Sequence, residues 1–346
     1  MKKFLGFLSL ILFAVVTIEF LYITQNNWFT KKIITEKPAP KPLLAYTFEN
    51  LKKTTFPKTQ ITLADITDEN EDSISQIFYY SVPQTPENKT LKRVSGLMNI
   101  PKKSGKYPVI IMFRGFVPDN IYKPGIGTEH VAQVLAKDGF ITLAPDFLGF
   151  GSSASPSADS FENRFQTYIT ALTLLSSLPS LNSGLEASYS GSITGDMSKI
   201  GIWGHSNGGH IALSTLAISA ATYPTVLWAP VSTSFPYSII YYSDESDDQG
   251  KAMRKTLSDF EDIYDTELFS PVNYYKWIKA PIEINQGLED QEVPYWRSDD
   301  LVSTLKKHNV SVDYFTYPNA DHNMLPNSWP DAVLNTVNFY KKEFSE

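Results

Sequence analysis

The sequence contains no cysteine among its 346 residues. Disulfide scaffolds, thiolate zinc sites, iron–sulfur clusters and cysteine nucleophiles are therefore excluded. It also contains neither a P-loop nor an H-E-x-x-H motif, so no nucleotide or zinc mechanism is indicated. Residues 149–154 fit a dinucleotide-binding fingerprint, but Ser155 and Pro156 follow directly and do not open the helix that this fingerprint requires. We therefore expect no cofactor and no metal.

Positive charge is in short supply, with 30 lysines and arginines against 37 aspartates and glutamates and a net charge of −7. This balance argues against nucleic acid as a partner. The hydrophobic content of 42% is ordinary for a globular protein and excludes a disordered chain. The first 60 residues alone are basic, with nine lysines against three glutamates. A solvated stalk and contact with anionic lipid both explain these lysines.

Long hydrophobic runs are absent apart from one at the N-terminus, over residues 4–23. Twenty helical residues span roughly 30 Å, the thickness of a bilayer core. Lys2 and Lys3 ahead of the run predict a cytoplasmic N-terminus. We expect residues 1–24 to be an uncleaved membrane anchor that holds the rest of the chain outside the cytoplasm. A cleaved signal peptide, which would give a secreted protein, is the alternative.

Residues 25–60 form a polar, basic stretch in which Pro38, Pro40 and Pro42 alternate with other residues, and we expect an extended spacer there. From residue 61 onward, short β-rich runs alternate with longer helical segments. This alternation predicts one α/β domain over residues 61–346, with a mostly parallel sheet covered by helices on both faces. The expected strands are 75–82, 91–100, 107–113, 140–144, 199–203, 225–229, 281–286 and 311–316. The expected helices are 129–137, 161–178, 208–221, 295–307 and 329–344.

A nucleophile motif stands between an expected strand and the helix after it, and it reads Gly204-His205-Ser206-Asn207-Gly208. This is G-x-S-x-G in a strand–turn–helix setting, where the turn is so tight that small residues must flank the serine. The serine is held above the sheet, and the N-terminus of the following helix favours developing negative charge. We expect Ser206 to be a nucleophile.

A serine nucleophile needs a base, and the chain offers five histidines. His322 lies in a loop just after the last expected strand, at the edge where α/β sheets gather site residues. The others stand in the elbow, on helices or in a polar run, and they are His205, His210, His130 and His308. Elimination and position both favour His322 as the base.

The acid that orients the base is expected between the serine and the histidine. The loop over residues 286–294 offers Glu289, Asp290 and Glu292. Asp321 is next to His322 in sequence, but adjacent side chains diverge, so it is a poor orienting partner. An acid from this loop gives the order serine, acid, histidine, which is that of the α/β-hydrolases.

From residue 107 to its end the chain resembles an α/β-hydrolase, and more narrowly the catalytic domain of the prolyl oligopeptidase family and its dienelactone-hydrolase-like relatives. The segments that carry the resemblance are 135–140, 145–152, the elbow, 269–274 and 287–322. The resemblance implies an α/β-hydrolase fold and a triad of Ser206, Asp290 and His322. Asp290 is implied because G-x-x-D followed by Val-Pro matches the acid loop of such enzymes, and Glu289 remains the alternative.

Acyl transfer also needs two donors for the oxyanion, and losing one costs about 2.7–4 kcal/mol. We expect the backbone N–H groups of Asn207 and Phe116 to serve. Relatives usually carry His-Gly ahead of the second donor, whereas this chain has Arg114 and Gly115. Arg114 is expected either to position a substrate carboxylate or to form a structural salt bridge.

About forty residues separate the expected strand 225–229 from Phe269, which is too long for a plain loop. Insertions here in α/β-hydrolases commonly cover the active site, so we expect a lid over residues 231–269. Its first part is aromatic and its second part is acidic. Together with Arg114, the candidate pocket residues are Tyr237, Tyr241 and Trp296, although packing within the lid explains the aromatic residues equally well. The acidic part is better explained by solvation than by substrate selection.

The sequence thus predicts a serine hydrolase that cleaves a carboxylic ester or a peptide bond through an acyl-enzyme. About 50 residues between the expected anchor and the first clear strand leave no room for the β-propeller of a true prolyl oligopeptidase. A small ester or a short peptide is therefore the expected substrate. The alternative is a non-catalytic, membrane-anchored binding protein on the same fold.

Overall fold

The computed structural model describes residues 16–19, 22, 40–88, 90–243 and 248–345. The chain divides into two units, Met1–Lys41 and Pro42–Glu346, and the second holds every element discussed below. The expected membrane anchor at residues 1–24 lies largely outside the described residues. Within the described part of the chain, no helix combines the length and the apolar character needed to cross a bilayer. The anchor stays a prediction from the sequence.

The strands among the described residues form one sheet in the order β1-β2-β3-β5-β4-β6-β7-β8-β9. Their bounds are β1 Thr62–Glu69, β2 Ser73–Pro83, β3 Leu91–Pro101, β4 Gly105–Phe113, β5 Ile141–Pro145, β6 Ile193–His205, β7 Thr225–Trp228, β8 Ile282–Gly287 and β9 Val312–Tyr317. β1, β2 and β3 pair antiparallel, as do β3 and β5. Every pair from β5 to β9 is parallel. The expectation of a mostly parallel sheet is confirmed.

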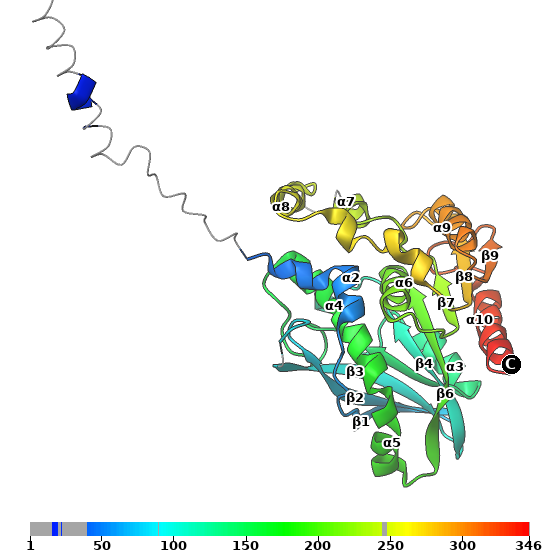
Figure 1. Cartoon of the computed structure of the whole chain (residues 1–346). Coiled ribbons are helices and arrows are strands. Elements are labelled where there is room, and N and C mark those ends of the chain that lie inside the picture. Colours follow the sequence, from blue (N-terminus) through cyan, green and yellow to red (C-terminus); the bar gives the residue numbers. More distant parts are fainter. Residues whose placement is uncertain (1–15, 20–21, 23–39, 89, 244–247, 346) are drawn as a thin grey trace, which may run out of the picture. The chain divides into compact units, whose positions relative to one another are not determined.

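The α-helices are α2 Phe48–Lys53, α3 Glu129–Lys137, α4 Ser160–Ser177, α5 Leu181–Tyr189, α6 Asn207–Ser219, α7 Tyr237–Ser243, α8 Lys251–Glu261, α9 Tyr295–Lys307 and α10 Trp329–Glu343. Short 3₁₀ turns complete the chain as η1 Pro42–Tyr46, η2 Asp119–Ile121, η3 Leu178–Ser180, η4 Thr266–Phe269 and η5 Pro271–Trp277. Alternate residues of β4 point to opposite faces of the sheet. Ile111 and Phe113 pack with α4 and α6, whereas Ile110 and Met112 pack with α3 and α10. The sheet is therefore covered on both faces (Figure 1).

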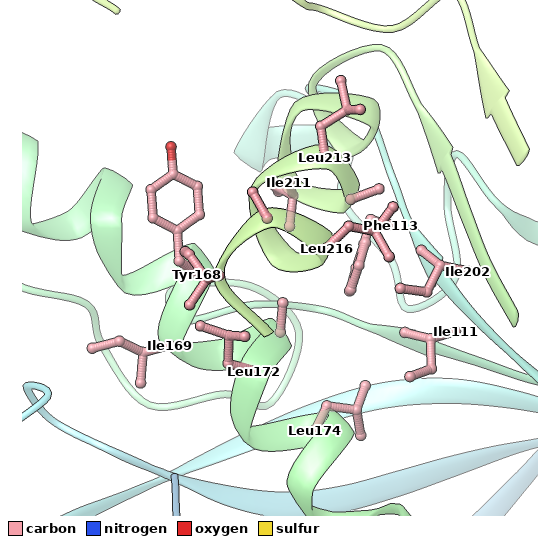
Figure 2. Packing of buried hydrophobic residues seen from close by; sticks show 14 of the residues in the cluster. Ile111, Phe113, Tyr168, Ile169, Leu172, Leu174, Ile202, Ile211, Leu213 and Leu216 are labelled. Carbon is pink, nitrogen blue, oxygen red and sulfur yellow. The ribbon is translucent and has the colours of Figure 1, made fainter. Parts of the chain in front are cut away.

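Helix α6 is buried on nearly all sides, and it carries the residue after the elbow serine at its first position. Figure 2 shows its Ile211 and Leu216 among apolar side chains of α4, β4 and β6. Leu216 is fully buried, and a Leu→Ala change at such a site typically costs about 2–5 kcal/mol of unfolding free energy. The N-terminus of α6 consequently rests on a close-packed core, which holds the elbow in place.

The folded domain begins earlier than the sequence patterns predict. The expected spacer ran over residues 25–60, but residues from Pro42 onward belong to the second unit. Phe48 and Leu51 of α2 are fully buried, and Phe48 stacks on Tyr274 with ring centroids 4.8 Å apart. The apolar residues of this segment are few and directly follow a proline-rich stretch. The polar and proline-rich composition of the region therefore predicts a spacer and not a buried helix. The spacer therefore cannot extend beyond residue 41.

Strand β6 begins six residues before its expected start at 199, and α5 was not expected at all. The early part of β6 is polar, with Asp196 and Ser198, and its pairing with β4 shifts register between Pro108 and Val109. Such an irregularity interrupts the apolar pattern by which a strand is recognised. The apolar second half of the strand is the part that the sequence predicts.

The insertion expected as a lid over residues 231–269 forms α7, α8 and η4, and α7 and α8 lie at the top of the view in Figure 1. It docks on α4 through aromatic rings. Phe260 lies against Phe161 with centroids 4.6 Å apart, and Phe269 stacks on Phe165 at 5.0 Å. Some aromatic residues of the insertion therefore pack against the body of the domain, and packing was one of the two interpretations of these residues.

Strand β8 carries a buried carboxyl group, Glu283, which accepts a hydrogen bond from Asn285 Nδ2 at 2.7 Å. Burial raises the pKa of Glu283 from 4.5 to about 7. Between these two values the folded protein keeps a proton that the unfolded chain releases. Stability consequently falls as the pH rises through this range, and the full penalty is present above pH 7.

We expect Glu283→Gln to raise the free energy of unfolding at pH 8 by on the order of 3 kcal/mol. At pH 4.5 the carboxyl is protonated in the folded protein, so the variant should match the wild type. Urea unfolding at both pH values measures the difference. Glu261→Gln, at an exposed position of α8, is the control and should change neither value. An equal gain for Glu283→Gln at both pH values would mean that packing, not protonation, causes it.

Candidate active site

The elbow serine, Ser206, stands between the end of β6 and the start of α6. Its backbone angles are φ 56° and ψ −121°, which non-glycine residues rarely adopt. The Ser206 N–H donates to the carbonyl oxygen of Trp228 at 2.9 Å, and the Ser206 carbonyl accepts from the N–H groups of Gly209 and Val231 at 2.9 and 3.0 Å. Three backbone hydrogen bonds thus hold the strained turn.

The glycines around Ser206 have a steric cause in the structure. A Cβ atom added at Gly204 would lie 2.6 Å from the carbonyl oxygen of Gly208, and one at Gly208 would overlap the carbonyl oxygen of Phe113. A Cβ atom at Gly115 would lie 3.0 Å from the Cβ of Ser206 itself. The elbow therefore packs against the end of β4 and the loop after it, with no room for side chains at these positions.

Asp290 and His322 come together from the loops after β8 and β9. His322 Nδ1 lies 2.8 Å from Asp290 Oδ2, and the Asp290 side chain is fully buried. Gln286 Nε2 and the N–H groups of Glu292 and Val293 also donate to this carboxylate, at 3.0, 2.9 and 2.8 Å. Four donors therefore surround one carboxylate.

These donors set the protonation of the pair. Burial acts to raise the pKa of Asp290, but the hydrogen bond and charge of His322 and the bonds from Val293 and Gln286 outweigh it and lower the pKa. An ionised carboxylate only accepts, so His322 Nδ1 carries the proton toward Asp290. His322 Nε2 is then left to act as a base.

The alternative acids lie elsewhere. The Glu289 side chain is exposed to solvent. Asp321 Oδ1 accepts from the N–H groups of Asn323 and Leu325, at 2.8 and 2.9 Å, and so shapes the turn after His322. Of the acids considered, Asp290 is the one that the structure brings into contact with the His322 ring.

His205, to which the sequence patterns gave no role, holds the His322 loop. His205 Nε2 donates to the carbonyl oxygen of His322 at 3.0 Å, and the two rings lie 4.6 Å apart. Burial and the neighbouring His322 lower the pKa of His205 to about 4, so it is neutral at neutral pH. It therefore positions His322 without adding a positive charge to the site. Its place beside the serine was a signal, but the sequence could not show which way the ring points.

The expected oxyanion donors flank Ser206. Asn207 is the first residue of α6, so its N–H has no acceptor within the helix and lies at the positive end of the helix dipole. Phe116 follows Gly115, and its side chain is 80% exposed. Phe116, Asn207, Ser206 and His322 all line one cavity of about 1530 Å³. Within the described residues the Ser206 hydroxyl makes no hydrogen bond, and we expect its bond to His322 to form when a substrate binds.

Arg114 lies away from this cavity, and its contacts match neither role expected for it. Its side chain is buried and donates to the carbonyl oxygens of Gly115 and Asp146 at 3.0 and 3.2 Å. Its guanidinium also lies 4.2 Å from the ring centre of Phe150. No carboxylate of the described residues forms a salt bridge with it. Backbone carbonyls, aromatic faces and the more distant charge of the Asp146 carboxyl group stabilise this guanidinium.

The other expected pocket residues, Tyr237, Tyr241 and Trp296, are exposed. None of them is among the described residues that line the cavity. Their place is taken by Arg164 of α4 and by three residues of α7, which are Ser238, Ile239 and Tyr242. Tyr242 follows Tyr241 but is rotated by about 100° around the helix. The sequence showed that aromatic residues gather here, whereas the rotation of α7 depends on its docking.

Comparison with known proteins supports this description. The model of the prolyl oligopeptidase family matches residues 127–346. The acylamino-acid-releasing enzyme of Mus musculus is 25% identical over 162 residues, which is 41% of this chain and 20% of that protein. Dipeptidyl peptidase family member 6 of Caenorhabditis elegans is 28% identical over 133 residues, 36% of this chain and 17% of that protein. The chain thus spans about a fifth of the length of the curated relatives it matches.

A solved structure of an acetyl xylan esterase from a Paenibacillus species has a TM-score of 0.57 and 17% sequence identity, over 84% of this chain and 91% of that one. At this identity the likeness concerns the fold, which is α/β-hydrolase-like. The family match is stronger, because it covers well over half of the chain and includes the elbow, the acid loop and the histidine loop. The chain belongs to the prolyl oligopeptidase family.

Proposed function

We propose that this protein is a serine hydrolase that cleaves a carboxylic ester or a peptide bond through an acyl-enzyme. One observation carries the proposal. Ser206, in the strained elbow, opens into the same cavity as His322, whose Nδ1 is 2.8 Å from the buried Asp290 carboxylate. A nucleophile, a base and an orienting acid in this relation are the requirements of acyl transfer.

In the proposed reaction, Ser206 Oγ attacks the substrate carbonyl carbon while its proton passes to His322 Nε2. The N–H groups of Phe116 and Asn207 stabilise the resulting oxyanion. The tetrahedral intermediate collapses to an acyl-enzyme, and the leaving alcohol or amine takes the proton from His322. A water molecule then attacks the ester in the same way, with His322 as base, and releases the acid product and free Ser206.

The class of substrate is proposed from the relatives. By their names, one curated relative releases acylamino acids, and one structural neighbour is an acetyl xylan esterase. We infer that this chain cleaves a small ester, or the amide bond that follows a short acyl or acylamino-acid group. A panel of p-nitrophenyl esters of increasing acyl length and N-acetylated or proline-containing peptide anilides tests this inference. We expect turnover of short esters or short acyl amides that Ser206→Ala abolishes, and no turnover of any panel member by folded protein would contradict the proposal.

A further inference from the structure

Helix α4 brings an arginine into the cavity that holds Ser206, and its guanidinium has no hydrogen-bond or ion-pair partner among the described residues. Arg164 Nε is shielded from solvent and makes no hydrogen bond. No hydrogen bond or ion pair to its guanidinium occurs among the described residues. Arg93, by contrast, donates to a backbone carbonyl, as does Arg114. A guanidinium stays charged in proteins, and the half-buried Arg164 keeps its Nε shielded from solvent without a partner, which a bound anion would supply.

A second, smaller cavity of about 270 Å³ meets the first one at Arg164. Gly115, Phe116 and Asn207 line both cavities, so the smaller one adjoins the two expected oxyanion donors. Among the residues that the structure describes, its lining contains two arginines, Arg114 and Arg164, and no aspartate or glutamate. Arg114 already interacts with the charge of the Asp146 carboxyl group, so Arg164 is the positive charge of the smaller cavity that no described carboxylate meets. This cavity lies next to the expected position of a substrate carbonyl.

The groups around Arg164 do not neutralise it. Burial lowers the pKa of Arg164, and the phenols of Tyr168 and Tyr242 raise it. Both phenols are uncharged at neutral pH, because their own pKa values are raised. His210 lines the smaller cavity and donates to or accepts from Tyr168 at 2.7 Å. Burial lowers the pKa of His210 to about 3, so it adds no charge. The described acidic residues that line the larger cavity are Glu71, Asp72, Glu129 and Glu292, and none of them shifts the pKa of Arg164.

We propose that the smaller cavity is a subsite for a carboxylate carried by the substrate, and that Arg164 is the residue that binds it. A planar guanidinium offers two parallel N–H groups that match the two oxygens of a carboxylate. Because the subsite adjoins the oxyanion donors, the carboxylate belongs to the acyl part, a few atoms from the carbonyl that is attacked. The substrate class is then an ester or amide of a dicarboxylic acid. This inference rests on the proposed function and narrows it.

Two p-nitrophenyl esters of equal chain length test the subsite, the butyrate and the monoester of succinate, which differ by one terminal carboxylate. We expect the wild type to prefer the succinate monoester. Arg164→Gln should lower the ratio of the two kcat/KM values, succinate over butyrate, by roughly ten- to a hundredfold, as expected for a charge-assisted hydrogen bond. Arg164→Lys, which keeps the charge but loses the fork, should lie between. Arg93→Gln removes an arginine that lines neither cavity and should leave the ratio unchanged.

The activity of Arg164→Gln on the butyrate shows that the variant is folded. An equal loss on both esters, or an unchanged ratio, would overturn the subsite while leaving the hydrolase intact. If the wild type hydrolyses neither ester, the wider panel of esters and anilides decides the proposed function, and binding decides the subsite. In that case calorimetry with monomethyl succinate should show binding to the wild type that Arg164→Gln weakens by the same factor, and equal or absent binding in both would overturn the inference.

Discussion

Replacing Ser206 with alanine should lower kcat by a factor on the order of 10⁶ for any substrate that the enzyme hydrolyses. The change removes the atom that forms the acyl-enzyme, while α6 and the core beneath it stay as they are. Alanine is smaller than serine and fits the elbow, so the thermal unfolding midpoint should stay close to that of the wild type. Single-turnover kinetics on the best ester of the panel measures the loss.

A matched control for this variant is Ser219→Ala, which removes a hydroxyl from the far end of the same helix. Ser219 Oγ donates to the carbonyl oxygen of Thr215 at 2.7 Å and accepts from the N–H of Ala221 at 3.2 Å. Ser219 lines neither cavity. Its kcat should equal that of the wild type. A Ser206→Ala enzyme that keeps a tenth or more of wild-type turnover would show that another group attacks the substrate.

Replacing Asp290 with asparagine should lower kcat by about 10⁴-fold. The buried carboxylate accepts from His322 Nδ1, and an asparagine can present its amide N–H₂ to that nitrogen instead. His322 would then carry its proton on Nε2 and could not accept one from Ser206. Asparagine keeps a carbonyl oxygen for the N–H of Val293, so the acid loop should fold as before. Initial rates at pH 8, with circular dichroism as the check on folding, measure the effect.

Glu289→Gln is the matched control, because Glu289 precedes Asp290 in the same loop but is exposed. We expect it to change kcat by less than about twofold, as is usual for a surface position. A larger loss for Glu289→Gln than for Asp290→Asn would reassign the acid. Asp290 was favoured over Glu289 through the family resemblance, and this pair of variants tests that choice independently.

The parts of the site that follow from local sequence rules were predictable. Close contacts within the elbow and with Phe113 require glycine two residues before and two residues after Ser206. Because these contacts are local, the glycines stand at fixed positions in the sequence and can be recognised there. The buried parallel strands also leave continuous apolar runs. Ser206 and His322 are placed by these elements, at the end of β6 and just after β9.

Other features depend on contacts between distant segments, and no local pattern encodes them. The choice of wall residue between Tyr241 and Tyr242 is set by how α7 docks. Arg164 lies 42 positions before Ser206 and reaches the cavity because α4 packs against α6. The start of the domain at Pro42 depends on a partner for Phe48, which is supplied by Tyr274 far along the chain. Long-range packing decided each of these outcomes.

Reaction with a fluorophosphonate tests the central claim most directly, because this reagent modifies serines that a neighbouring base activates. After incubation of the full-length protein and proteolytic digestion, mass spectrometry locates the adduct. We predict one adduct, on the peptide that contains Ser206, and its loss in Ser206→Ala. A folded wild-type protein that carries no adduct, as a non-catalytic binding protein would, or one that carries it on a different serine, would contradict the account.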